Sequence, residues 1–504
     1  MTPARAWIVA RSAWPLRGIA VLFGLLAALG LAPFDLPLLA LVGFAGLMLA
    51  ILPAQTPRQA FLVGLFGATG YFGLALHWIV DPFFVDPWRH GWMAPFALLF
   101  MASGMALFWG SATALAARLT APGAGRAVLL ALALTLAEIL RAYVLTGFPW
   151  AHPGHIWIGS PLMGLAAWIG PHGLTLVTLS LAAGLTAALW ARPGLALLPV
   201  AGLIGLFAAG FAIPAAPGAA EDAPVMRLVQ PNAPQHLKWQ PEMIPVFFRR
   251  ALDLSAQASG GAAPALIIWP ETSLPALLRN SDEWRAEIAR ASGAAQVILG
   301  GQRLVEGMAR NSLIHLDAAG AVTAIYDKHH LVPFGEYVPL TGMARTLGLR
   351  GLAEAAGPGY APGQGPQRLD LGRFGQVFPM ICYEAIFAQY IRQVERPDWM
   401  VQITNDAWFG GFSGPYQHLE LAQLRAAEQG LPLLRAANTG VSAVIDARGQ
   451  VLASLPLGQH GALDTVLPPA LPATIYARTG DGPIAALLLV VLGLAAIRQR
   501  HVRH

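Results

Sequence analysis

The sequence of 504 residues has few of the charged side chains that keep a soluble protein in water. Charged residues make up 12% of the chain and hydrophobic residues 56%, whereas soluble domains have about a quarter charged residues. The first 220 positions hold only four of the 27 acidic residues, namely Asp35, Asp81, Asp86 and Glu138. This distribution excludes a wholly soluble protein and predicts that most of the first half lies in lipid.

Cysteine and lysine are also scarce. Cys382 is the only cysteine, which excludes an intramolecular disulfide and leaves packing or reactivity as its role. Lys238 and Lys328 are the only lysines among 32 basic residues. Either these two positions have drifted from arginine, or they need a compact cation that can change its protonation state.

Long hydrophobic runs take the place of the missing charges. A helix that crosses the hydrocarbon core needs ~20 mostly apolar residues. We expect eight such helices, at residues 17–33, 37–53, 59–80, 92–116, 127–146, 162–190, 195–213 and 482–497. The first run has a basic start like a signal peptide, but the spans directly behind it favour a retained anchor. The prediction is a multi-span α-helical membrane domain at residues 1–220, with a C-terminal transmembrane helix at 480–498.

The arginines predict the orientation in the membrane. With a cytoplasmic N-terminus, the outer side has Arg89, Arg141 and Arg478 near its spans, and the inner side has many more: Arg5, Arg11, Arg17, Arg58, Arg118, Arg126, Arg192, Arg498, Arg500 and Arg503. This bias fits the positive-inside rule. It predicts that both termini are cytoplasmic and that residues 225–470 lie on the outer face, which in a bacterium is the periplasmic side of the inner membrane. The basic inner loops account for much of the net charge of +5, so nucleic acid is not an expected partner.

Residues 225–470 have short apolar runs separated by turns and amphipathic stretches. We expect helices at 241–259, 282–292 and 416–429, and strands at 226–230, 265–270, 296–302, 312–317, 322–327, 376–384, 399–405 and 441–446. The strings DAAG (317–320) and DARG (446–449) are typical of hairpin turns. This alternation predicts an α/β domain with a mostly buried sheet.

Three chemically complementary residues follow predicted strands. Glu271 comes after ALIIWP, Lys328 after VTAIYD, and Cys382 at the end of QVFPMI. Functional groups gather at strand ends in α/β sheets, because the strand fixes the side chain and the loop admits substrate. A carboxylate can take the thiol proton, and an ammonium can stabilise a thiolate and an oxyanion. The pattern predicts nucleophilic catalysis, with Glu336 and Glu384 left open as alternative bases.

Several long strings carry a resemblance to a known family. WPETSLP (269–275), YDKHHLVPFGEYVP (326–339) and FPMICYE (378–384) resemble, in this order, the Glu-Lys-Cys signature of the nitrilase, or carbon-nitrogen hydrolase, superfamily. With TNDAWFG (404–410), GFPW (147–150) and membrane spans on both flanks, the whole chain resembles the apolipoprotein N-acyltransferase family. The resemblance implies that residues 225–470 form an αββα sandwich.

The resemblance also implies roles for individual residues. It makes Glu271 the general base, Lys328 the transition-state stabiliser and Cys382 the nucleophile. It further marks six residues as part of the site: Trp239, Asn311, Glu336, Tyr383, Glu384 and Trp408. Apart from the resemblance, the two tryptophans fit ordinary packing and Glu336 fits a partner that holds the lysine. The pair after Lys328 is His-His, where the family often has Asn-His.

The implied reaction is a two-step acyl transfer that completes lipoprotein maturation. Cys382 takes an acyl chain from a membrane phospholipid as a thioester, and the α-amine of an apolipoprotein's diacylglyceryl-cysteine then accepts it. No cofactor or metal is implied, and the HPGH histidines (152–155) have no identifiable third ligand. Two alternatives stay open: a membrane-tethered amidase acting on a small amide, and a transporter or scaffold that binds lipoproteins. The apolar segment 342–356 is either a loop that touches lipid or a plain surface loop.

Overall fold

The computed structural model describes residues 2–220, 222–339 and 359–503, so segment 342–356 lies outside the described residues. The described chain forms two compact units. The first unit comprises Met1–Pro214, Phe412–Glu420 and Thr474–His504, and the second comprises Ala215–Gly411 and Leu421–Ala473.

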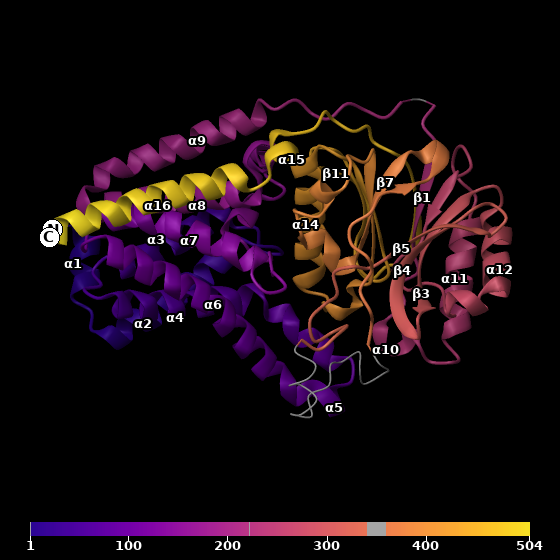
Figure 1. The fold of residues 1–504 in the computed structure, drawn as a ribbon, viewed down its shortest axis with the longest axis horizontal. Helices are drawn as coiled ribbons and strands as arrows, with labels where there is room; N and C mark the ends of the chain where they lie inside the picture. Colours follow the sequence, from indigo (N-terminus) through magenta and orange to yellow (C-terminus); the bar gives the residue numbers. More distant parts are fainter. Residues whose placement is uncertain (1, 221, 340–358, 504) are drawn as a thin grey trace. The chain divides into compact units, whose positions relative to one another are not determined.

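The first unit is helical (Figure 1). Its helices are α1 (Pro3–Val9), α2 (Ala13–Ala28), α3 (Pro37–Ile51), α4 (Pro57–Ala75), α5 (Pro87–His90), α6 (Ala94–Leu119), α7 (Gly125–Tyr143), α8 (Ala166–Ala191), α9 (Leu197–Phe211), α15 (Ile475–Thr479) and α16 (Gly482–Arg503). Small residues let these helices approach closely: a Cβ on Gly24 of α2 would lie 1.9 Å from the main-chain oxygen of Gly67 in α4. Such contacts are typical of helix packing in membranes.

Four helical segments of the described residues are long and apolar enough to cross a membrane. They are Pro87–Leu119, Pro161–Ala191, Pro193–Phe211 and Gly482–His501. The bent pair Pro57–Ala75 and His77–Phe84 makes a fifth if it is one span. The chain is therefore a membrane protein with several candidate spans.

Eight spans were expected, whereas the described residues have four or five candidate spans. The difference has two physical reasons. The spans expected at 17–33 and 37–53 correspond to α2 and α3, which have only 16 and 15 residues. The span expected at 127–146 corresponds to α7, a helix of 19 residues that includes Arg126, Glu138 and Arg141. A count of eight spans remains a prediction.

A buried group of charges lies in the first unit. The Glu138 carboxylate accepts hydrogen bonds from the Trp109 indole at 2.7 Å and from Arg141 Nε at 3.1 Å, and lies 2.5 Å from His152 Nδ1. Arg141 also donates to the Trp150 main-chain oxygen at 2.8 Å. Because Glu138 and Arg141 are buried, each needs the other to offset the loss of water.

Replacing Glu138 by Ala should destabilise the helical unit strongly. The Arg141 guanidinium would stay buried without its carboxylate, at a cost of about 3–5 kcal/mol in the free energy of unfolding. The thermal unfolding midpoint in detergent, followed by tryptophan fluorescence, measures this loss. Arg58→Ala, at an exposed position near the start of α4, is the control and should leave the midpoint nearly unchanged. Equal midpoints for the two variants would contradict the structural role of Glu138.

The second unit has two six-stranded sheets. The first sheet has the order β12 (Gly461–Val466), β1 (Val225–Gln230), β2 (Leu266–Ile268), β3 (Gln296–Val305), β4 (Met308–Leu316) and β5 (Val322–Asp327). The second has the order β11 (Val451–Leu455), β10 (Ser442–Ile445), β9 (Leu433–Ala437), β8 (Trp399–Thr404), β7 (Gln376–Ile381) and β6 (Leu369–Asp370). Each sheet mixes parallel and antiparallel pairs. The prediction of an α/β domain is confirmed.

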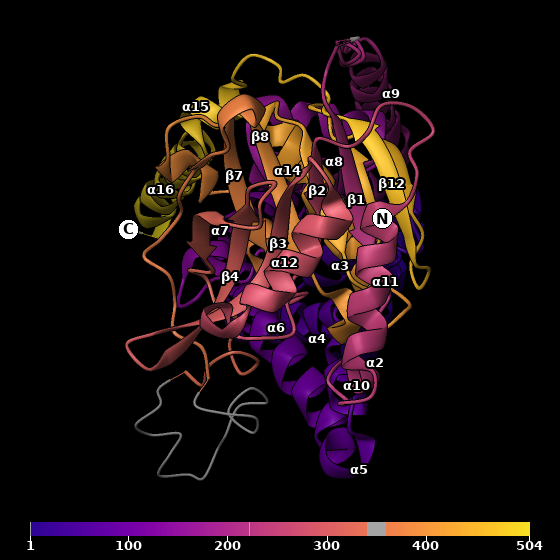
Figure 2. The ribbon, with the colours of Figure 1, turned by 90° about the vertical axis from the view of Figure 1, so that its right-hand side faces the viewer.

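The sheets pack face to face, with helices on the outer faces. One core cluster joins residues of both sheets, such as Leu228 and Ile298 of the first with Val401 and Leu434 of the second. A second cluster joins the outer face of the first sheet to α11 (Ile244–Ala256) and α12 (Asp282–Ser292), which lie in front of β1 and β2 in Figure 2. Residues 421–429 of α14 (Gly414–Gln429) flank the second sheet (Figure 1). Because the faces of the sheets are covered, a functional site can form only at the ends of the strands.

Candidate active site

The three residues expected to form the catalytic group come from the ends of three strands. Glu271 follows β2, Lys328 follows β5, and Cys382 follows β7. The Lys328 ammonium lies 3.9 Å from the Glu271 carboxylate, and both charges act on the Cys382 thiol. All three residues are buried. The structure therefore brings together three side chains that lie more than 50 positions from one another in the sequence.

The Glu271 carboxylate is held from both sheets. Oε1 accepts a hydrogen bond of 2.7 Å from Asn311 on β4, and Oε2 accepts one of 2.9 Å from the main-chain N–H of Asn405, which follows β8. Burial raises the pKa of Glu271 above its ordinary value of 4.5, and the Lys328 ammonium opposes this effect. A carboxyl group that is fixed in place and has a raised pKa can act as a general base near neutral pH.

A glycine allows the turn that carries Glu271. Thr272 has a left-handed backbone with φ of 53°, and the main-chain N–H of Ser273 donates to the oxygen of Gly300 at 2.8 Å. A Cβ on Gly300 would lie 2.3 Å from the Thr272 nitrogen, so no larger residue fits without moving the turn. The glycine pair in QVILGGQ therefore contributes to the direction of Glu271.

Lys328 lies between two carboxylates. Its ammonium donates to Glu336 at 2.8 Å, and its main-chain N–H donates to the oxygen of Asn311 at 2.8 Å. Burial lowers the pKa of Lys328, but the Glu336 and Glu271 carboxylates outweigh burial and raise that pKa above its ordinary value. The side chain therefore carries a fixed positive charge, which can stabilise an oxyanion.

Cys382 begins a tight turn at the end of β7. Its φ of 50° is in the left-handed region, where a residue with a Cβ is strained. Its carbonyl oxygen accepts a bond of 3.2 Å from Gln402, which accepts one of 2.6 Å from Arg435. Arg435 in turn forms a buried ion pair of 2.5 Å with Asp406. A polar network from Gln402 to Asp406 thus fixes the turn at Cys382, which would otherwise relax.

The Cys382 thiol needs a base to react. Burial raises its pKa, the Glu271 carboxylate adds to the rise, and the Lys328 ammonium opposes it. A thiol of this kind stays protonated at neutral pH unless a neighbouring group takes the proton as the new bond forms. Two carboxylates act on this thiol, Glu271 with the larger effect and Asp406 with the smaller, and Glu271 also lies 3.9 Å from the Lys328 ammonium.

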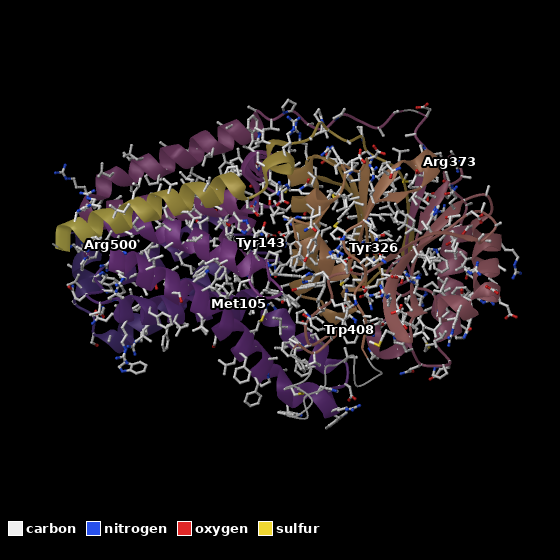
Figure 3. All side chains as sticks on the ribbon, viewed as in Figure 1. Met105, Tyr143, Tyr326, Arg373, Trp408 and Arg500 are labelled. Atoms are coloured by element: carbon white, nitrogen blue, oxygen red, sulfur yellow. The ribbon has the colours of Figure 1, made fainter. Side chains whose placement is uncertain are left out.

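Glu384 joins the turn at Cys382 to the segment that follows Lys328. Oε2 accepts a bond of 2.8 Å from the Ile381 N–H, and Oε1 accepts bonds of 2.8 Å from the His329 N–H and from the Tyr326 hydroxyl. Tyr326, labelled in Figure 3, belongs to the core between the sheets. Burial raises the pKa of Glu384, but hydrogen bonding and the charge of His329 outweigh it, so the net pKa is lowered. Its contacts are those of a residue that positions Cys382 and Lys328.

Three aromatic residues were also expected at the site, and the charge of Lys328 acts on one of them, Tyr383. Tyr383 is buried, with its ring centroid 5.1 Å from that of Phe387 and 5.6 Å from that of His330. Trp408, labelled in Figure 3, ends the short helix η10 (Asp406–Trp408) that follows Asn405. Trp239 follows α10 (Gln235–Lys238) and is 43% exposed. Within the described ranges, neither indole is found to hydrogen-bond to Glu271, Lys328 or Cys382.

Sequence reasoning missed the residues that hold Glu271 and Cys382 through hydrogen bonds. Asn405, Gln402 and Arg435 lie on or after strands of the second sheet and contact Glu271 and Cys382 directly or through one another. The string TNDAWFG includes Asn405 and was the one available signal. Among the described residues, no group of three or more His, Cys, Asp or Glu could hold a metal ion.

The two mixed sheets, with Glu271, Lys328 and Cys382 at strand ends, make up a carbon-nitrogen hydrolase domain. Residues 227–475 match the family described as Carbon-nitrogen hydrolase, and residues 23–184 match Apolipoprotein N-acyltransferase N-terminal domain.

Curated relatives match along nearly the whole chain. The apolipoprotein N-acyltransferases of Caulobacter vibrioides and Rhodopseudomonas palustris are 38% and 37% identical, over 97% of this chain and 95% and 96% of their own lengths. The enzyme of the same name from Bradyrhizobium diazoefficiens is 38% identical over 97% of this chain and 96% of its own. The chain belongs to the apolipoprotein N-acyltransferase family.

Replacing Glu271 by Gln should slow alkylation of Cys382 by iodoacetamide. In the wild type, the rate should rise with pH as Glu271 loses its proton, above its ordinary 4.5 because burial raises this pKa. In the variant, the thiol must ionise alone against its own raised pKa, so we expect a rate at least about tenfold lower at pH 7.5. Mass spectrometry follows the reaction without ambiguity because the chain has one cysteine.

The matched control is Glu306→Gln, at an exposed turn of the same unit. This variant should have the pH profile of the wild type. If Glu271→Gln retained that profile as well, another group would be taking the thiol proton.

Proposed function

We propose that this protein transfers an acyl chain from a membrane phospholipid to the α-amino group of the N-terminal diacylglyceryl-cysteine of apolipoproteins, and so completes lipoprotein maturation. The observation that carries the proposal is the near full-length similarity to apolipoprotein N-acyltransferases. It agrees with the buried cluster of Glu271, Lys328 and Cys382 and with the several candidate spans.

The first half of the proposed reaction acylates Cys382. Glu271 takes the thiol proton as the sulfur attacks the ester carbonyl carbon of the phospholipid, and the negative charge that develops on oxygen lies near the Lys328 ammonium. The intermediate collapses when the bond to the glycerol oxygen breaks. That oxygen takes the proton from Glu271, and a lysophospholipid leaves.

The second half of the proposed reaction returns the free thiol. The α-amine of the apolipoprotein attacks the thioester carbonyl carbon, and Glu271 takes a proton from the amine. When the bond from carbon to sulfur breaks, the sulfur leaves as a thiolate and recovers the proton from Glu271. The products are an N-acylated lipoprotein and the starting enzyme, so no metal or diffusible cofactor is required.

The surrounding residues have supporting roles in this proposal. Glu336 and Asn311 hold Lys328 and Glu271 through the bonds of 2.8 and 2.7 Å described above. Glu384 ties the Cys382 turn to the segment after Lys328, and Tyr383 packs behind the nucleophile. We assign Trp239 and Trp408 to contacts with the substrates, because both lie on short turns near the strand ends and neither is fully buried.

The proposal includes a placement in the membrane. About eight spans, seven in residues 1–220 and one at 480–498, would put the carbon-nitrogen hydrolase domain at 225–470 on the periplasmic side of the inner membrane. Both termini would then be cytoplasmic. In this placement both lipid substrates reach the site from the bilayer, and the positive-inside bias of the arginines supports it.

Incubation with phospholipid should add one acyl group to Cys382. We expect the wild-type protein to gain the mass of one acyl chain, and the gain to disappear on addition of a synthetic diacylglyceryl-cysteine peptide, which becomes N-acylated. Intact-mass and peptide mass spectrometry measure both steps. An active preparation that never carries an acyl group on Cys382 would exclude the thioester mechanism.

Two controls separate the alternatives. A membrane-tethered amidase would turn over simple amides without phospholipid, whereas we expect no turnover of these compounds. Cys382→Ala should abolish function in cells that depend on this protein for lipoprotein maturation. If the variant supported growth, a transporter or a lipoprotein-binding scaffold would explain the chain better than an enzyme.

A further inference from the structure

Lys238 is, besides Lys328, the other lysine of the chain, and the mechanism above does not use it. It ends α10 and is 8% exposed. Its ammonium donates a hydrogen bond of 3.2 Å to the main-chain oxygen of Glu271 and lies 5.4 Å from the ring centroid of Trp239. Burying a lysine ammonium costs free energy because the ammonium loses its water. Interactions with the Glu271 residue must offset this cost.

The Lys238 ammonium contacts the main chain of Glu271, the residue whose carboxylate must be oriented toward the thiol. The Glu271 oxygen belongs to the peptide that leads into Thr272, which has the left-handed φ of 53°. The Gly300 contact holds the other side of the same turn. The ammonium therefore holds the peptide from which the Glu271 side chain projects, at a point where the backbone is strained.

The charges of Glu271, Glu336 and Lys328 balance only when Lys238 is counted. Glu271 and Glu336 are two carboxylates, and Lys328 supplies one positive charge between them. Burial lowers the pKa of Lys238 to about 8, and the Glu271 carboxylate opposes this effect. The ammonium is thus mostly charged at neutral pH and brings the buried group to zero net charge with the thiol protonated.

A small cavity adjoins this ammonium. It has a volume of about 30 Å³ and is lined in part by Lys238, Trp239, Thr272 and Phe247. A water molecule needs about 10–15 Å³ of such space. The cavity can therefore supply a water to the ammonium hydrogens that the Glu271 oxygen does not accept.

We infer that Lys238 is a positioning residue for the general base: its ammonium anchors the Glu271 turn and supplies the second positive charge that keeps the Glu271 carboxylate ionised. This inference rests on the proposed function for its catalytic meaning. The groups that face Glu271 are Lys328, Lys238, Glu336, Asn311, the Asn405 N–H, the Cys382 thiol and the Tyr360 hydroxyl. Of these, Lys328 and Lys238 are the positive charges.

The test is the pH profile of Cys382 alkylation by iodoacetamide in the full-length protein in detergent. Lys238→Met removes the charge and keeps most of the side-chain volume. Loss of a nearby positive charge raises a carboxyl pKa, so the midpoint of the profile should move to higher pH by at least about half a unit. The rate of Cys382 acylation by phospholipid should fall about tenfold at pH 7, as for other residues that orient catalytic groups.

Two further variants separate charge from structure. Lys238→Arg keeps the positive charge, so the midpoint should stay near the wild-type value even if the rate falls. Arg250→Met is the matched control, because Arg250 also donates to a main-chain oxygen of this unit, that of Pro231 at 2.8 Å. Its alkylation midpoint should not move. An unchanged midpoint in Lys238→Met, or an equal shift in Arg250→Met, would overturn the inference.

The alkylation readout does not require the proposed substrates. If the wild type forms no acyl adduct but Lys238→Met shifts the alkylation midpoint, the proposed function fails and the inference about Lys238 stands. If the adduct forms normally and the midpoint does not move, the inference fails and the proposed function stands.

Discussion

The buried positive charge of Lys328 is the constraint on which the arrangement of the site depends. Two carboxylates, Glu271 and Glu336, are held at 3.9 and 2.8 Å from its ammonium. Without that cation, the carboxylates would repel each other in surroundings that cannot solvate them. With it, Glu336 fixes the lysine and Glu271 stays available to the thiol. In the proposed reaction, the same charge stabilises the oxyanion on the acyl carbon.

This constraint explains why the site is built from both sheets. Glu271, Asn311 and Lys328 lie on or after strands of the first sheet, and Cys382 and Asn405 follow strands of the second. The Glu271 carboxylate accepts one bond from a residue of each sheet, so the packing of the two sheets sets the position of this carboxylate relative to the Cys382 thiol. A rigid core of interdigitated side chains is what holds such a geometry within the tolerance that catalysis needs. The apolar layer between the sheets is therefore a functional element as well as a source of stability.

The sequence was informative where side-chain chemistry and strand pattern coincide. Each of the eight expected strands overlaps a strand of the structure, and the turns at 317–320 and 446–449 join antiparallel neighbours. Strand β9 was missed because its five residues, LLRAA, include a charged residue and lack β-branched ones. The charge is Arg435, whose buried pairing with Asp406 exists only in the folded chain. Contacts made by main-chain groups, such as the Asn405 N–H, leave no trace in residue type, and sequence reasoning could not supply them.

The span count shows the same limit in the helical unit. Hydropathy cannot tell a helix of 15 residues that is buried among others from one that meets lipid, and α3 has most of its residues buried. Nor can it anticipate that α7 includes a Glu138–Arg141 pair. Charged residues among apolar helices persist where they are paired and hold other parts of the chain, and Arg141 holds the oxygen of Trp150 in the GFPW string. In both units, then, a buried ion pair fixes a turn with left-handed residues, here Gly147 and Ala151 and at the active site Cys382. Such turns relax when their partners are removed. The buried charged residues of each unit therefore hold these turns in place.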